Sequence, residues 1–126
     1  MTDKVVVLVT CGSAEEAGQI ARALVGERLA ACVNISSPIR SLYHWEGKLC
    51  DDQEVLLVIK TARSLFDQVR RAVEKLHSYQ VPEVICLPVI DGAPNYLNWL
   101  TAAVVGETPP TSARRRAKAK SSQRRK

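Results

Sequence analysis

Two histidines and four cysteines are the side chains of this chain best suited to metal ligation or nucleophilic chemistry. His77 ends a predicted helix, where its ring can complement the negative helix end and bond to the last free carbonyls. This structural role is the simpler interpretation of His77, and metal ligation is the alternative. Glu83 begins a strand just after Pro82, where it could be a metal ligand or an ion-pair partner of Lys60.

The cysteines lie far apart, and no two of them have the Cys-x-x-Cys spacing of a zinc ribbon or a redox motif. Cys11 and Cys32 stand in apolar, strand-like surroundings, where a free cysteine usually behaves as a small hydrophobic residue. We therefore expect reduced thiols and a cytoplasmic protein. Neither histidine has a serine or cysteine placed convincingly beside it, so we expect no enzymatic activity.

Several aromatic residues could line a cleft for a ligand. These are Tyr43, Trp45 and Trp99, although aromatic side chains at a subunit contact are more often packing anchors. Lys60 ends an otherwise apolar strand, which suggests an anionic partner. A lysine that extends its charged end back to water is the alternative.

The elements that must position these residues are organised around a long hairpin, Arg40–Thr61. Its turn is Trp45-Glu46-Gly47-Lys48, in which Gly47 can take a positive φ without steric cost. The continuous apolar run Val55–Ile59 predicts a base that is covered on both faces, whereas the arm is polar with an aromatic tip. We expect this arm to reach beyond its own domain and contact another copy of the chain.

The remaining elements follow from apolar periodicity and turn residues. Ser13 and Glu16 match a capping box at a helix start. Ser36-Ser37-Pro38 should interrupt the second strand, and Pro88 favours an edge position for the last strand. We predict strands at Lys4–Thr10, Leu29–Ile35 and Glu83–Val89, and helices at Ala14–Glu27, Ser64–His77 and Asn95–Val105.

This β-α-β-β-α-β order with a C-terminal helix predicts an α+β, ferredoxin-like fold with a long central hairpin. Two helices would cover one face of its sheet, and the open face also favours self-association. We place one folded domain at residues 1–105 and a disordered basic tail at 106–126.

The charge is divided unevenly between these two parts. Eight of the 18 Lys and Arg residues lie in Arg114–Lys126, so residues 1–113, with 10 basic and 13 acidic residues, carry a formal charge of −3. The basic tail could contact nucleic acid or another polyanion without specificity, although a solubilising tail is the default interpretation. We expect no membrane association, because no apolar run approaches the length of a span and the first residues lack signal-peptide features.

Six blocks of the chain, in consistent order from about Val5 to Leu100, closely resemble the CutA family of divalent-cation tolerance proteins: VVVLVTCGSAEEA, ALVGERLAACVNI, SLYHWEGKL, EVLLVIKT, HSYQVPEV and NYLNWL. The resemblance implies a ferredoxin-like fold and a homotrimer in which long hairpins extend neighbouring sheets. It also implies a cytoplasmic protein linked to copper and other divalent cations, with no established catalytic activity. By fold-level analogy with PII signalling proteins, inter-subunit clefts would bind small ligands; the cleft residues would be Lys60, Tyr43, Trp45, Cys32 and Trp99.

Some bacterial members of that family carry a proposed copper site with one strand cysteine and two adjacent histidines. The matching positions here hold Val9, Leu76 and His77, so only His77 agrees. Cys11, two residues from Val9 on the same strand face, could substitute, and Glu83 is the nearest partner across the connector. We therefore expect Cu(II), or another divalent cation, to bind at His77, Glu83 and Cys11. The protein would then be a trimer that takes part in metal-ion tolerance. A small-ligand or scaffold protein is the alternative.

Overall fold

The computed structural model describes residues 1–106 of the 126-residue chain. The basic run Arg114–Lys126, and with it the expected tail, lies outside the described residues. The strands are β1 (Lys4–Cys11), β2 (Cys32–Ile35), β3 (Ile39–Trp45), β4 (Lys48–Ala62) and β5 (Val84–Pro88). The helices are α1 (Ala14–Gly26), the short 3₁₀ helix η1 (Arg63–Leu65), α2 (Phe66–Leu76) and α3 (Pro94–Ala103).

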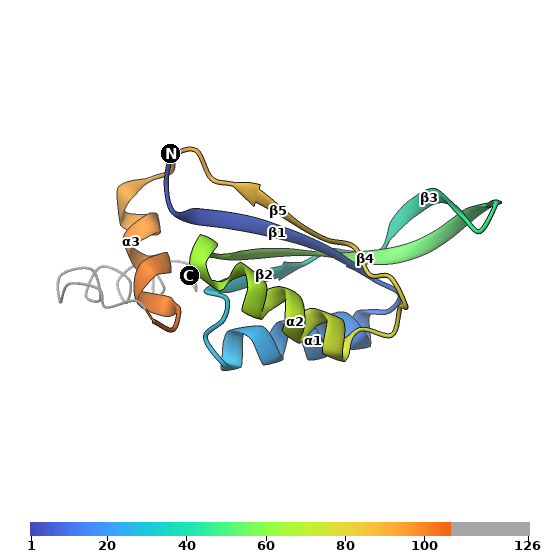
Figure 1. The fold of residues 1–126 in the computed structure, drawn as a ribbon, viewed down its shortest axis with the longest axis horizontal. Coiled ribbons are helices and arrows are strands. Elements are labelled where there is room, and N and C mark those ends of the chain that lie inside the picture. The colour runs from blue at the N-terminus through green and yellow to red at the C-terminus, as the bar shows by residue number, and fades with distance from the viewer. Residues whose placement is uncertain (107–126) are drawn as a thin grey trace.

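The sheet has the antiparallel order β2-β4-β1-β5, and β3 pairs with the far part of β4. Helices α1 and α2 lie side by side on one face of this sheet (Figure 1). This arrangement confirms the α+β, ferredoxin-like fold, and β5 is an edge strand, as Pro88 predicted. No helix within residues 1–106 is long and apolar enough to cross a membrane.

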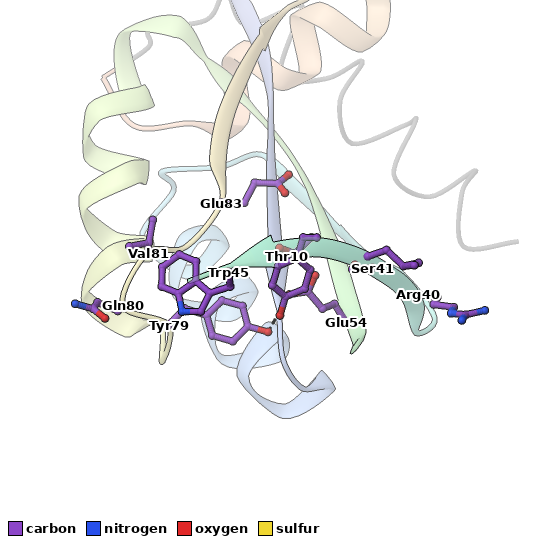
Figure 2. A pocket seen from close by; sticks show the side chains of 11 residues that line it. Thr10, Arg40, Ser41, Trp45, Glu54, Tyr79, Gln80, Val81 and Glu83 are labelled. Atoms are coloured by element: carbon purple, nitrogen blue, oxygen red, sulfur yellow. Dashed lines mark hydrogen bonds between the residues drawn. The ribbon is translucent and has the colours of Figure 1, made fainter. Parts of the chain in front are cut away.

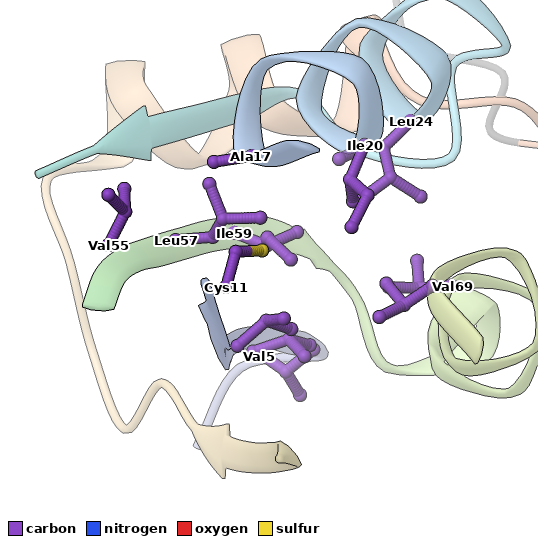
Figure 3. Close-up of a cluster of buried hydrophobic side chains, with 13 residues drawn as sticks. Val5, Cys11, Ala17, Ile20, Leu24, Val55, Leu57, Ile59 and Val69 are labelled. Carbon is purple, nitrogen blue, oxygen red and sulfur yellow. The ribbon is translucent and has the colours of Figure 1, made fainter. Parts of the chain in front are cut away.

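The main core lies between the sheet and the two helices, because alternate strand residues point toward them. Figure 3 shows side chains of β1 and β4, such as Val5 and Leu57, meeting Ile20 and Leu24 of α1 and Val69 of α2. Cys11 is the last residue of this stripe on β1, and it is fully buried. A second, smaller cluster joins α3 to the end of β4 through Ala31, Ala62, Leu65, Leu100 and Val104.

The β3–β4 hairpin extends away from the helices and from the rest of the sheet (Figure 1). Trp45 pairs with Lys48 across a two-residue turn, in which Glu46 and Gly47 have φ values of 51° and 79°. Two positive φ angles match the twist of the flanking strands, so the predicted turn is confirmed. Contact between this arm and another copy of the chain stays a prediction.

The predicted interruption at 36–38 separates β2 from β3, and Ser36 replaces the lost ladder bonds. Its N–H donates to the carbonyl of Leu56 at 2.9 Å, and the N–H of Leu56 donates to its hydroxyl oxygen at 2.8 Å. The predicted start of the second strand at Leu29 is wrong, because Arg28 turns the chain with φ of 59° and the Leu29 N–H caps α1 at the Leu24 carbonyl. The strand therefore begins at Cys32.

Candidate metal cluster and adjoining pocket

The His77 ring lies inside the protein, directed at the end of β1. Its side chain is 0% exposed. Nε2 lies 2.7 Å from the Thr10 carbonyl oxygen, and Nδ1 accepts the backbone N–H of Tyr79 at 3.0 Å. A carbonyl only accepts, so Nε2 carries the proton and the ring is the neutral Nε2–H tautomer. The expected bond between this ring and the last carbonyls of its own helix is therefore absent, although His77 does end α2.

Glu16 of α1 holds the connector that follows His77. One carboxylate oxygen accepts the N–H of Ser78 at 2.8 Å, and the other accepts the Ser78 hydroxyl at 3.2 Å and lies 3.7 Å from His77 Nδ1. The predicted capping box is thus half formed. Ser13 Oγ accepts the N–H of Glu16 at 3.2 Å, but the Glu16 carboxylate is directed at the connector instead of the helix start.

Cys11 completes a cluster with these two residues. The Cys11 sulfur, a Glu16 oxygen and a His77 nitrogen all lie within 4.8 Å of one another. Burial, with smaller contributions from Glu16 and Glu54, raises the pKa of the Cys11 thiol to about 11. The expectation that no cysteine stands beside a histidine is therefore wrong, but this thiol is buried and stays protonated at neutral pH, unlike an activated nucleophile.

The donor types of this cluster suit a divalent transition-metal ion. A thiolate, an imidazole and a carboxylate together are typical of zinc and copper sites. Binding would require one proton to leave and, if the ion takes Nδ1, one hydrogen bond to break, because Cys11 must lose its proton and His77 Nδ1 already accepts the N–H of Tyr79. Sequence reasoning missed Glu16, whose one signal was its place in the capping box. Glu83 is not in this cluster, and its role as a ligand stays a prediction.

A pocket of about 670 Å³ adjoins the cluster where the hairpin leaves the sheet (Figure 2). The pairing register puts Tyr43, Trp45 and Glu54 on one face of the hairpin, toward this pocket. The Tyr79 hydroxyl donates to the Glu54 carboxylate at 2.8 Å, as the dashed line in Figure 2 shows. The full lining is Thr10, Arg40, Ser41, Leu42, Tyr43, Trp45, Glu54, Tyr79, Gln80, Val81 and Glu83.

A carboxylate in the case of Tyr43, and burial together with a carboxylate in the case of Tyr79, keep the two tyrosine hydroxyls of this pocket protonated. The Tyr43 hydroxyl donates to Asp52, and this bond is the main cause that raises the Tyr43 pKa to about 12. Burial, and then the bond to Glu54, raises the pKa of Tyr79 as well. The pocket therefore combines aromatic walls with negative charge at neutral pH.

The five residues expected to line one cleft lie in three places within a single chain. Tyr43 and Trp45 line the pocket, together with Glu83. Cys32 is half-buried on β2 and stands opposite Lys60 of β4. Trp99 lies on α3. A joint cleft would therefore require more than one copy of the chain.

Lys60 and Trp99 both have partners inside the chain. The Lys60 ammonium group donates to the Asn34 side-chain oxygen, and within the described residues it forms no ion pair with Glu83. The Trp99 ring packs against Tyr96, with 5.5 Å between the ring centroids. Both of these aromatic residues contact the smaller core cluster of α3. The structure therefore gives Trp99 a packing role.

Comparisons with known proteins identify the relatives of this chain. Residues 5–103 match the family described as CutA1 divalent ion tolerance protein. The divalent-cation tolerance protein CutA of Thermus thermophilus is 50% identical over 95 residues, which are 75% of this chain and 92% of that protein. The chloroplastic protein CutA of Arabidopsis thaliana is 48% identical over 96 residues, 76% of this chain, which spans only 53% of the plant protein. A solved structure of Cut A1 from Thermus thermophilus superposes with a TM-score of 0.78 at 46% identity, covering 80% of this chain and 98% of that one.

Proposed function

The chain belongs to the CutA1 divalent ion tolerance family, and from this premise we propose that it is a homotrimeric protein that binds divalent cations, copper foremost. The observation that carries the proposal is the convergence of Cys11, Glu16 and His77 within 4.8 Å. These residues would hold the ion, and the bound ion would supply a fixed positive charge at the junction of β1, α1 and α2. Cu(II) heads the affinity order of divalent ions at sites with nitrogen and sulfur donors.

The trimer is supported by the apolar surface that one copy leaves uncovered. Ile85 and Leu87 of β5 stand opposite Leu8 and Val6 of β1 on the face away from the helices, and both β5 residues are exposed. On the projecting hairpin, Leu42 and Leu49 are 59% and 67% exposed. An apolar sheet face and an apolar arm of this kind are features of association surfaces, and a second and third copy would cover them.

We propose a binding role without catalysis. The Cys11–His77 pair is the nearest approach to a nucleophile and a base, but its thiol pKa is raised to about 11 and its side chains are buried. We also propose a cytoplasmic location, because all four cysteines, each within the described residues, are free thiols. The chloroplastic name of the Arabidopsis relative belongs to that protein.

The pocket supports a second candidate function, the binding of a small ligand. Its volume of about 670 Å³ is in the range of small-molecule sites, and it is lined by three aromatic rings and two carboxylates. Contact between the basic tail and polyanions remains a prediction from the sequence. Glu83 lines this pocket and lies outside the metal cluster. Its role as a metal ligand remains a prediction from the sequence.

Competitive titration of the full-length protein with Cu(II), Zn(II) and Mg(II) tests the main function. We expect affinity to fall in the order Cu(II), Zn(II), Mg(II), with one ion bound per chain. Binding should perturb the NMR signals of Cys11, Glu16 and His77. An equal affinity for Mg(II) would indicate an oxygen-only site elsewhere and would contradict the proposal.

A further inference from the structure

The two ring nitrogens of His77 have different partners, and this difference decides which of them can hold an ion. Nε2 donates to the Thr10 carbonyl oxygen at 2.7 Å, so the ring is fixed in the tautomer whose Nδ1 carries a lone pair. Metal-bound histidines have this arrangement as a rule, because a carbonyl or carboxylate that accepts the other ring N–H orients the imidazole. Nδ1 also faces the Glu16 carboxylate, at 3.7 Å. The geometry therefore favours Nδ1 as the ligating atom.

The backbone of Tyr79 occupies the lone pair of this nitrogen, since its N–H donates to Nδ1 at 3.0 Å. An imidazole nitrogen has a single lone pair, so a hydrogen bond and a metal bond exclude each other at this atom of His77. A carboxylate oxygen has two lone pairs, so Glu16 could ligate an ion while it still accepts the Ser78 N–H, now 2.8 Å away. Of these two neighbouring amides, only that of Tyr79 competes with an ion.

Further contacts hold Tyr79 in this position. Its hydroxyl donates to Glu54 of β4 at 2.8 Å, and its ring lies beside that of His77, with 4.6 Å between the centroids. The ring passes close to Gly12, where an added Cβ would lie 3.1 Å from the hydroxyl oxygen. These contacts leave the ligand atoms free of any other bond, but they stabilise the conformation in which the Tyr79 N–H stays on Nδ1.

We propose that the Tyr79 N–H is a latch on the metal cluster, which must leave His77 Nδ1 before a divalent cation can bind there. The latch is closed when the N–H is on Nδ1 and open when it has left. This inference rests on the proposed function, because it concerns the same cluster. By linkage, any change that weakens the closed state increases the affinity for the ion.

The latch also makes the cluster selective among cations. Opening it breaks a hydrogen bond, and only an ion that binds strongly to an imidazole nitrogen offsets this loss. Zn(II) and Cu(II) do so, whereas Mg(II) prefers oxygen ligands and gains little from the ring of His77. Tyr79 is thus a positioning residue that sets the specificity of the site without touching the ion.

A titration of the full-length protein with Zn(II), followed by NMR, tests the latch directly. Zn(II) suits the same ligand types as Cu(II) and is diamagnetic, so the signals near the site stay observable. We expect the Nδ1 signal of His77 to shift while Nε2 keeps its proton. The Tyr79 amide should exchange with solvent at least about tenfold faster in the Zn(II)-bound protein, and the Ser78 amide should not. An ion that only rigidified the connector would slow the exchange of both amides.

Tyr79→Phe tests the latch through affinity, because it leaves every ligand atom in place. Loss of the hydroxyl bond to Glu54 weakens the closed state, so the affinity for Zn(II), measured by calorimetry, should rise by about three- to tenfold. Tyr96→Phe is the matched control, since it removes a tyrosine hydroxyl from α3, at the other end of the sheet (Figure 1). Its affinity should equal that of the wild type. If Tyr79→Phe fails to fold, the amide exchange of the wild type decides the result.

The outcomes separate the latch from the proposed function. Zn(II) that perturbs none of Cys11, Glu16 and His77 would contradict both. Zn(II) bound at the cluster would support the metal site but overturn the latch if Nε2 lost its proton or the Tyr79 amide stayed protected. An affinity of Tyr79→Phe no higher than that of the wild type, or an equal rise in Tyr96→Phe, would also overturn the latch alone.

Discussion

His77 and Tyr79 join the metal cluster to the pocket through adjacent bonds. The Tyr79 N–H donates to His77 Nδ1 at 3.0 Å, and the two rings lie 4.6 Å apart between centroids. The Tyr79 hydroxyl in turn donates to Glu54 at 2.8 Å. An ion that takes the Nδ1 lone pair must displace the Tyr79 N–H, so occupation of the cluster and of the pocket should influence each other, and linkage makes this influence reciprocal.

The position of Tyr79 can be tested at Gly12. A Cβ added there would lie 3.1 Å from the Tyr79 hydroxyl, so Gly12→Ala must displace the ring or the turn. We expect a loss of about 1 kcal/mol in the free energy of unfolding, measured by urea denaturation at a fixed protein concentration. Gly26→Ala is the control, since a Cβ there meets nothing within 4 Å and should be neutral or stabilising by up to about 1 kcal/mol. Equal effects of the two variants would contradict this role of Gly12.

Alkaline pH should destabilise the protein through Cys11. Its pKa is about 11 in the folded protein against 9.0 for an unperturbed thiol. The unfolded chain therefore loses this proton first, so the contribution is intact below pH 9 and is lost as pH rises through 11, by about 3 kcal/mol in all. Chemical denaturation between pH 8 and 11 measures it. In Cys11→Ala this part of the pH dependence should disappear, and an unchanged slope in that variant would assign the effect to other groups.

Association should be inseparable from folding. If three copies cover one another's apolar sheet faces and arms, the unfolding midpoint should rise with protein concentration. Light scattering at micromolar concentration should give the mass of three chains of 13.9 kDa. A folded monomer at that concentration, with a midpoint independent of concentration, would show that the exposed apolar surface has another purpose.

The basic run Arg114–Lys126 should account for any affinity for polyanions. Its deletion removes eight positive charges and leaves a chain of formal charge −3. We expect the truncated protein to keep its fold and its oligomeric state but to lose DNA binding. The affinity of the full chain for DNA should fall steeply with salt. Fluorescence anisotropy with a labelled duplex measures both. DNA binding that persists after the deletion would contradict the prediction.

Local patterns predicted the fold, whereas the site depended on contacts distant in sequence. The hairpin turn was predictable because Gly47 permits a positive φ, and the face of Cys11 followed from strand alternation with Val9. The partners of Glu16 were not predictable, since Ser78 is 62 positions away. The role of Glu54 was not predictable either. In the sequence it belongs to the polar arm, and the Tyr79 hydroxyl that donates a hydrogen bond to it comes from the distant connector after α2.

The most direct test of metal binding at Cys11, Glu16 and His77 is a calorimetric Cu(II) titration of three proteins at one pH. These are the wild type, His77→Ala, and His44→Ala, which removes the exposed histidine of the hairpin as a control. Circular dichroism first establishes that all three are folded. We expect His77→Ala to lower Cu(II) affinity at least tenfold, about 1.4 kcal/mol, and His44→Ala to leave it unchanged. Unchanged affinity in His77→Ala, or an equal loss in His44→Ala, would contradict the assignment of the ion to this cluster.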